Sequence, residues 1–284
     1  MAFEHFLVES VTKAGAKNVD HNEISHNNNG DIDMSGSFRV YKHMWIERKL
    51  SDFELQGLCG ALVHDTPFDH SLKPGQFVKP LPEKRFKLNR APQEPVVKLG
   101  KKEHIDKFFL TGKLQLGSFA YYNDFDHPEI GDVEEGAVTL VAKTPFGVMA
   151  GKYGSGYNHR MFCTYVGHLD QTTMKKFGYD SGFIVTDPAG FAQAIASAIS
   201  ASTFTYGQCL YHPHKAVLGF PGHDVDRHQL SHRTGQMVKA GKHFIKPMRY
   251  SHQREFRFLW EMPQDVSGAE IVDCSAARQY CNQL

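Results

Sequence analysis

The sequence predicts an α+β protein, and three observations carry this prediction. Strand-type segments outnumber helix-type segments, they gather toward the C-terminal end of the chain, and no repeating βαβ order is present. An internal repeat, a GxGxxG sequence and a P-loop are also absent from the sequence. At 284 residues, with 41% hydrophobic and 22% charged residues, the chain is long enough for one large globular domain or two small ones.

The N-terminal third predicts an extension ahead of the main domain. Residues 15–37 are polar and predict a loop, whereas residues 38–47 alternate as a strand does. Ser51 is expected to cap a short amphipathic helix over residues 52–65. Residues 66–95 contain six prolines and predict an extended connection. We therefore expect an N-terminal extension or small subdomain over residues 1–90 and a main domain over residues 91–284.

From Val96 onward, apolar runs and helix signals follow each other closely. A helix is predicted where Gly112 closes it, and another where Asp187 and Pro188 provide an N-cap and a first-turn proline. A hairpin is predicted around Thr144–Pro145. The predicted helices span residues 101–112, 169–178 and 188–200. The predicted strands span residues 96–99, 114–124, 137–143, 146–154, 160–167, 182–186, 203–212, 243–250, 254–261 and 269–274.

Composition argues against several classes of function. The formal charge of +1 argues against a surface dedicated to coating DNA or RNA. No apolar run approaches the roughly 18–20 residues of a membrane span, and the first ten residues lack the pattern of a secretory signal. The five cysteines are scattered and form no CxxC pair, which favours the reducing cytoplasm. We expect a cytoplasmic protein that binds a small molecule and no membrane.

The most informative stretch is HQREFRFLW, residues 252–260, because it predicts a strand with two different faces. One face would carry Gln253, Glu255 and Arg257. The other face would carry Arg254, Phe256 and Phe258, with the two rings directed into the core. The polar face could line a cleft, or it could be a solvated surface with a modest cross-strand ion pair.

A second candidate lies in residues 114–136, where a predicted strand leads into a loop rich in tyrosines and acids. Adjacent aromatic rings can stack on a flat ring, and carboxylates can orient ribose hydroxyls or bind a metal ion. An acidic surface loop with one packed tyrosine is an equally valid interpretation. The candidate residues are Tyr121, Tyr122, Asn123, Asp124, Asp126, Glu129, Asp132, Glu134 and Glu135.

Histidines form the third feature, within residues 212–233. Metal sites need two or three imidazoles that converge at fixed spacing, and His228 and His232 could share a helix face. No HExxH or comparable signature is present, so we expect a polar loop and no metal. The histidines concerned are His212, His214, His223, His228 and His232.

The order of these segments resembles a family of uncharacterised bacterial and phage proteins with an ADP-ribosyltransferase-like fold. The matching pieces begin with VVKLGKKEHIDKFFLTGKLQLGSFAYYND and the core strand MFCTY. They continue with GFIVTDPAGFAQAI and FIKPMRYSHQREFRF, so the resemblance covers residues 95–265. The family strand typically ends Phe-Asn-Asp-Pro, whereas this chain has Tyr122–Asn123–Asp124–Phe125.

The resemblance implies split antiparallel β-sheets with flanking helices and a nicotinamide pocket, with NAD as a substrate. In it, Gln253–Arg254–Glu255 corresponds to the Gln-x-Glu motif, with Glu255 catalytic and Gln253 orienting the acceptor. Lys98 would meet the diphosphate, Tyr121 or Tyr122 would stack on nicotinamide, and Thr164 would hold its edge. The remaining cofactor-binding residues would be Asn123 and Arg257. Arginine-specific members have an arginine and a Ser-Thr-Ser triplet where this chain has Lys98 and Cys163–Thr164.

Three hypotheses about function follow from these patterns. The first is a mono-ADP-ribosyltransferase that modifies a protein or nucleic acid in toxin action, phage–host conflict or defence. The second is a catalytically inactive ligand-sensing or protein-binding module on the same fold, with a partner protein at the N-terminal extension. The third is a metal-dependent hydrolase or nuclease built on the histidines and acids.

Overall fold

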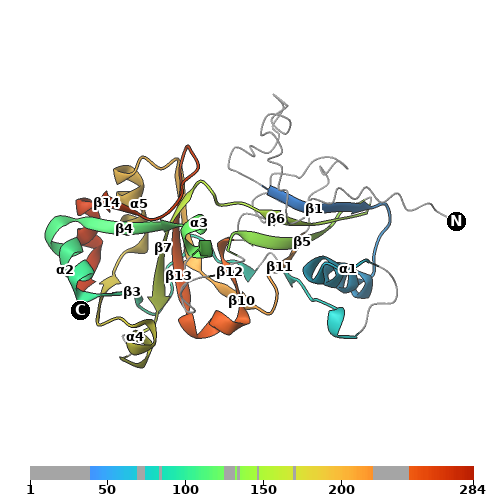
Figure 1. Cartoon of the computed structure of the whole chain (residues 1–284), viewed down its shortest axis with the longest axis horizontal. Helices are drawn as coiled ribbons and strands as arrows, with labels where there is room; N and C mark the ends of the chain where they lie inside the picture. Colours follow the sequence, from blue (N-terminus) through green and yellow to red (C-terminus); the bar gives the residue numbers. More distant parts are fainter. Residues whose placement is uncertain are drawn as a thin grey trace. The chain divides into compact units, whose positions relative to one another are not determined.

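The chain forms two compact units, which we call unit 1 and unit 2 (Figure 1). The structure is a computed structural model, and it describes residues 39–68, 74–82, 85–124, 132, 135–145, 147–168, 171–219 and 243–284. Unit 1 comprises residues 1–86, 136–156 and 212–248. Unit 2 comprises residues 87–135, 157–211 and 249–284.

The domain boundary expected near residue 90 coincides with only the first junction between the units. Residues 136–156 and 212–248 lie in the expected main domain but belong to unit 1. The described residues before residue 87 are therefore grouped with parts of residues 136–156 and 212–248 in one discontinuous unit. Sequence patterns do not reveal this arrangement, because strand pairing between distant segments leaves no local signal.

Unit 1 is built on a five-stranded sheet with α1 (Asp52–His64) packed against it. The predicted cap is confirmed, because Ser51 and Glu54 form a reciprocal capping box at the start of α1. The predicted hairpin is confirmed as well, with β5 and β6 antiparallel throughout. In order across the sheet, the strands are β1 (Arg39–Ile46), β6 (Val148–Gly154), β5 (Ala137–Lys143), β11 (Ala216–Gly219) and β2 (Leu81–Pro82).

Unit 2 contains an eight-stranded antiparallel sheet, and β7 (His159–Val166) is its centre. One edge of β7 pairs along its length with β13 (Glu255–Glu261). The opposite edge is shared, because β4 (Lys113–Ser118) pairs with its first half and β3 (Val96–Gly100) with its last residues. The remaining strands of the sheet are β8 (Ser181–Val185), β9 (Thr203–Gln208), β14 (Glu270–Asp273) and β15 (Cys281–Gln283).

One face of this sheet carries the core of unit 2. Phe162, Phe256, Phe258 and Trp260 extend from β7 and β13 and are almost fully buried. They pack with α2 (Lys102–Thr111) and α5 (Pro188–Ala198), whose predicted boundaries are confirmed at Gly112 and Asp187. Gly112 has φ 76°, which a residue with a side chain rarely adopts, and it ends α2.

The remaining elements are short, and some differ from expectation. Residues after Ser118 form helix α3 (Phe119–Asp124) instead of continuing as a strand. The strand expected over residues 243–250 shrinks to β12 (Ile245–Pro247), followed by η3 (Met248–Gln253). The other elements are η1 (Pro74–Gln76), α4 (Gln171–Phe177), β10 (Leu210–His212) and η4 (Ser275–Tyr280).

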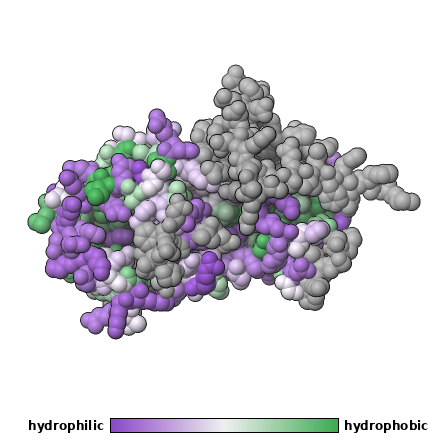
Figure 2. All heavy atoms as spheres, in the orientation of Figure 1, coloured by the Kyte–Doolittle hydropathy of each residue, from purple (hydrophilic) through white to green (hydrophobic). Residues whose placement is uncertain are grey.

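The visible surface of the described residues is mostly hydrophilic, with a few separate hydrophobic spots (Figure 2). Most large apolar side chains of the described residues lie in the cores. Within these residues no helix has the length and hydrophobicity needed to cross a bilayer. The α+β class is confirmed. The exposed large hydrophobic residues are Phe53, Leu110, Met248, Ile271 and Leu284.

Candidate functional site

Glu255 opens β13 on the face of the sheet opposite the core of unit 2. Register pairs Glu255 with Tyr165 and Arg257 with Cys163, so these four side chains share one face. The expected division is confirmed for Phe256 and Phe258, which are buried in the core. The interpretation of a solvated polar face is wrong, because Glu255 and Arg257 are only 5% and 1% exposed. Charged side chains this deeply buried require partners.

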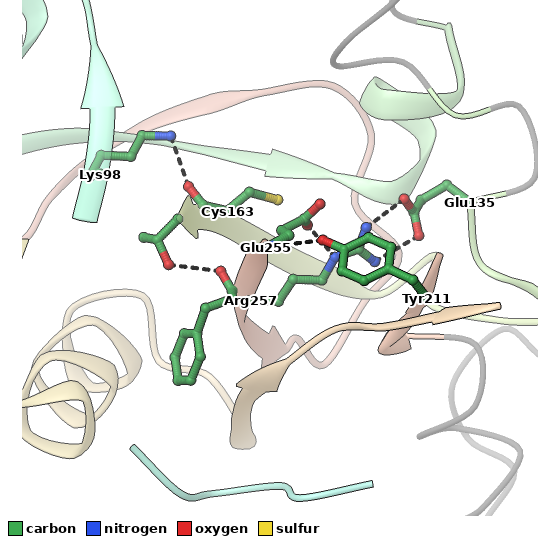
Figure 3. A network of polar contacts seen from close by, with 8 residues as sticks. Lys98, Glu135, Cys163, Tyr211, Glu255 and Arg257 are labelled. Atoms are coloured by element: carbon green, nitrogen blue, oxygen red, sulfur yellow. Dashed lines mark hydrogen bonds and ion pairs between the residues drawn. The ribbon is translucent and has the colours of Figure 1, made fainter. Parts of the chain in front are cut away.

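Arg257 provides the partner for Glu255 and also binds a second carboxylate (Figure 3). Its Nη1 and Nη2 donate to Oε1 and Oε2 of Glu135 at 2.7 and 2.8 Å. Its Nε donates to Oε1 of Glu255. Burial by itself lowers the pKa of Arg257, but Cys209, Glu135 and Glu255 raise it well above its usual range. Arg257 therefore remains a cation and fixes both carboxylates.

The backbone of Glu255 is fixed as well. Its N–H donates to the hydroxyl oxygen of Tyr211 at 2.7 Å, and its carbonyl accepts from the N–H of Cys209 at 2.9 Å. Burial first, and then the charges of Cys209 and Glu255, raise the pKa of Tyr211. Tyr211 therefore stays protonated, and its hydroxyl proton is available to a further acceptor. Sequence reasoning did not select Tyr211, because no motif marks it.

Gln253 does not share a strand with Glu255. It belongs to η3, and Arg254 between them adopts φ 42°, so the strand alternation stops at Glu255. Gln253 is nevertheless buried, at 5% exposure. Arg254 points to a different partner, because its Nη2 contacts Oε1 of Glu94 at 2.5 Å in an exposed pair. The expectation that one strand face presents Gln253, Glu255 and Arg257 is corrected.

Lys98 lies where β3 and β4 diverge along the shared edge of β7. Its Nζ donates to the carbonyl oxygen of Cys163 at 3.0 Å and lies 4.6 Å from the centre of the Phe162 ring. Desolvation lowers the pKa of Lys98, whereas Cys163 and Glu255 act in the opposite direction. Lys98 thus provides a hydrogen bond to the edge of β7 and lies within electrostatic range of Glu255.

The two tyrosines of α3 gather at the same face. Tyr121 and Tyr122 contact edge to face with ring centres 5.2 Å apart. Gly117 lets the Tyr122 ring approach closely, since a Cβ on Gly117 would lie 2.6 Å from ring atom Cε2. Burial is the largest cause that raises the pKa of Tyr122, followed by Cys163 and Glu255. Tyr122 is therefore close to both the Cys163 thiol and the Glu255 carboxylate.

The other acids and the amide of this region are only partly described. The Asn123 side-chain oxygen is buried and has no hydrogen-bond partner within the part of the chain that the structure describes. Asp132 is buried at 2% exposure, and its N–H donates to the carbonyl of Tyr122. The side chain of Asp124 and all of Asp126, Glu129 and Glu134 lie outside the described residues.

Thr164 lies on the face of β7 that is opposite Glu255, on the side of the core of unit 2. It is paired with Phe256, and its Oγ1 donates to the Phe256 carbonyl at 2.8 Å. Because strand side chains alternate, its neighbour Cys163 occupies the face of Glu255 instead. Cys163, and not Thr164, therefore shares a face with Glu255. Cys163 is partly exposed, whereas the other four cysteines are buried.

The histidines do not form a metal site in the described part of unit 1. His214 packs edge to face against His64 with ring centres 5.4 Å apart. His223, His228 and His232 lie outside the described residues. Among the residues that are described, no group of three His, Cys, Asp or Glu side chains is arranged to hold a metal ion. The described side chains gathered around Glu255 in unit 2 include carboxylates, tyrosines, the Cys163 thiol and the cations Lys98 and Arg257.

Comparisons with protein-family models, curated proteins and solved structures found no match for this chain.

Proposed function

We propose that unit 2 is a mono-ADP-ribosyltransferase that uses NAD as a substrate and modifies a macromolecule. The observation that carries the proposal is the placement of Glu255. Its carboxylate is buried at the start of a central strand, is held by Arg257, and is close to Tyr122 and Cys163. The edge of β7 shared by β3 and β4 supports an ADP-ribosyltransferase-like split sheet. Analogy of fold supports this step and does not replace a test of the site.

The reaction makes one demand that a fixed carboxylate meets. The bond between the ribose C1′ and the nicotinamide nitrogen breaks, and nicotinamide leaves with the electron pair. Positive charge develops on the ribose, as in glycoside cleavage. The acceptor then forms a bond to C1′ with its own lone pair and releases a proton. A carboxylate held beside the developing cation stabilises the transition state more than the ground state.

The roles proposed for the side chains follow their positions. Glu255 stabilises the ribose cation, and Arg257 holds the Glu255 carboxylate in place. Tyr121 and Tyr122 offer rings for stacking on nicotinamide. Lys98 supplies positive charge near the diphosphate, and Asn123 offers a buried side-chain oxygen. Gln253 is proposed to orient the acceptor from η3, immediately ahead of the strand.

A second candidate is a binding module on the same fold that has no catalytic activity. The specific observation in its favour is that Arg257 already engages one oxygen of Glu255, as it would in a purely structural ion cluster. This candidate predicts NAD binding, or binding of a related ligand, without release of nicotinamide.

The first experiment measures nicotinamide release and transfer of labelled ADP-ribose from NAD. Wild type, Glu255→Gln and Glu94→Gln are each incubated with protein, RNA and DNA fractions of a bacterial lysate. We expect wild type and Glu94→Gln to release nicotinamide, and Glu255→Gln to lose about 10²–10³-fold in rate. Equal rates in wild type and Glu255→Gln would reject Glu255 as the catalytic residue. Release by none of the proteins would reject the transferase.

Thiol labelling tests NAD binding independently of catalysis. Burial raises the pKa values of Cys59, Cys274 and Cys281 to about 12, so these thiols are unreactive at pH 8. Cys163 is the partly exposed thiol, so it is expected to react first with iodoacetamide. Saturating NAD should slow labelling of Cys163, as followed by peptide mass spectrometry. Unchanged labelling in the presence of NAD would place NAD away from Cys163.

A further inference from the structure

Glu135 is a charged residue of the site to which the proposed function assigns no role so far. Its side chain is 2% exposed and makes two parallel hydrogen bonds to Nη1 and Nη2 of Arg257. A second carboxylate on the same guanidinium is unnecessary for neutralising Arg257, since Glu255 already contacts Nε. Burying a further charge is costly unless it is fully paired. A role in the function of the site therefore explains the burial of the Glu135 carboxylate better than a contribution to stability does.

The first effect of Glu135 is on the balance of charge around Arg257 and Glu255. A cluster of Arg257 and Glu255 alone has zero net charge, which would cancel the field of the carboxylate at the ribose. Glu135 offsets the positive charge of Arg257 through its two hydrogen bonds, so that the negative charge of Glu255 is not neutralised by its own partner. This negative charge is buried, where it is screened little by solvent and acts strongly on a developing cation.

Geometry gives Glu135 a second effect. A bidentate contact holds the plane of a guanidinium, and here it also fixes the direction in which Arg257 Nε points toward Glu255 (Figure 3). Two backbone hydrogen bonds also connect Glu135 to helix α3. The N–H of Glu135 donates to the carbonyl of Asp132, and the N–H of Asp132 donates to the carbonyl of Tyr122. These two backbone hydrogen bonds connect Tyr122, which offers its ring to nicotinamide, with Glu135, which holds Arg257.

We propose that Glu135 is a positioning residue of the transferase, which orients Glu255 through Arg257 and offsets the positive charge of Arg257 beside the reacting ribose. The proposal rests on the proposed function, since it assigns Glu135 to the chemical step of that reaction. Glu135 touches neither the substrate nor the reacting atoms in this arrangement. Its loss should therefore lower kcat for nicotinamide release and leave the KM for NAD nearly unchanged.

The test compares four variants of the full chain in the nicotinamide-release assay. Glu135→Gln keeps the shape and removes the charge, whereas Glu135→Asp keeps the charge and shortens the reach to Arg257. Glu255→Gln reports on the catalytic residue. Glu94→Gln is the matched control, because Glu94 forms an exposed pair with Arg254 in the same unit. Thermal unfolding of each variant shows whether it is folded at the assay temperature.

We expect Glu135→Gln to lower kcat at least ~10-fold with KM for NAD within about threefold of wild type. Glu135→Asp should lower kcat by a smaller factor, and it serves in place of Glu135→Gln if that variant does not fold. Glu94→Gln should match wild type. Wild-type kcat in Glu135→Gln and Glu135→Asp, or a raised KM with unchanged kcat, would overturn the role of Glu135 while leaving the transferase in place. Absence of release by wild type would overturn both proposals.

Discussion

Two arginines three residues apart in the chain make opposite kinds of contact with glutamate. Arg254 and Glu94 form a pair whose side chains are 40% and 47% exposed. Arg257 and Glu135 form a pair whose side chains are 1% and 2% exposed, and Arg257 also holds Glu255. The residue types are identical, so burial alone separates a pair that solvent screens from one that determines the electrostatics of its surroundings.

The difference arises from where each arginine sits on the backbone. Arg254 precedes β13 and adopts φ 42°, which takes its side chain out of the strand pattern. Arg257 is inside β13 between β7 and β9, so its side chain extends over the centre of the sheet. A surface pair of this kind contributes about 0–1 kcal/mol. A buried pair with one partner removed costs several times more.

The largest expected change in the free energy of unfolding comes from removing the arginine of the buried cluster alone. Arg257→Ala leaves Glu135 and Glu255 buried without their cation, and we expect a loss of about 3–5 kcal/mol in the free energy of unfolding. Urea denaturation followed by tryptophan fluorescence measures this loss. A loss under about 1 kcal/mol would mean that water reaches the two carboxylates, contrary to their burial.

A smaller effect is expected when all three charges are removed together. The triple variant Arg257→Met, Glu135→Leu and Glu255→Leu replaces the cluster with apolar side chains. Its free energy of unfolding should equal or exceed that of wild type, by up to about 4 kcal/mol, because no charge remains desolvated. Nicotinamide release should be abolished in the same protein. A triple variant as unstable as Arg257→Ala would show that packing, and not charge, governs this position.

The smallest effect is expected at the exposed pair. Glu94→Gln removes the partner of Arg254, and the change in the free energy of unfolding should stay within about 1 kcal/mol. Repeating the denaturation of wild type and Glu94→Gln at high salt should reduce even that difference, since salt screens exposed charges. A change as large as that of Arg257→Ala would mean that the two pairs do not differ as their exposure indicates.

The sequence predicted the core face of β13 because aromatic residues at alternate positions are a local signal. Phe256 and Phe258 are confirmed in the core for this reason. Gln253 could not be placed correctly, because the end of a strand depends on the positive φ of Arg254, which no side-chain pattern announces. The face of the sheet on which Thr164 lies could not be predicted either. Its face depends on register with β13, and register is set by a segment 92 residues away.

The contact between Glu135 and Arg257 could not be predicted from local sequence patterns. Glu135 was one of several acids in a predicted acidic loop, and its pairing with Arg257 spans 122 residues. A buried arginine is a signal that a carboxylate must exist, but the sequence offers many carboxylates and no way to choose between them. The fold class followed from composition and periodicity, whereas the charge cluster required the structure.

The interleaved order of the two units has a consequence for making fragments of this protein. The chain crosses between the units at residues 86/87, 135/136, 156/157, 211/212 and 248/249. A fragment that starts after Phe86 keeps β5, β6 and β11 but lacks β1, α1 and β2, so it retains three of the five strands of the sheet without α1 and the two edge strands. We therefore expect such a truncation to aggregate instead of giving an isolated unit 2. To isolate unit 2, residues 136–156 and 212–248 would have to be replaced with linkers as well. One linker would join residue 135 to 157, and the other would join residue 211 to 249.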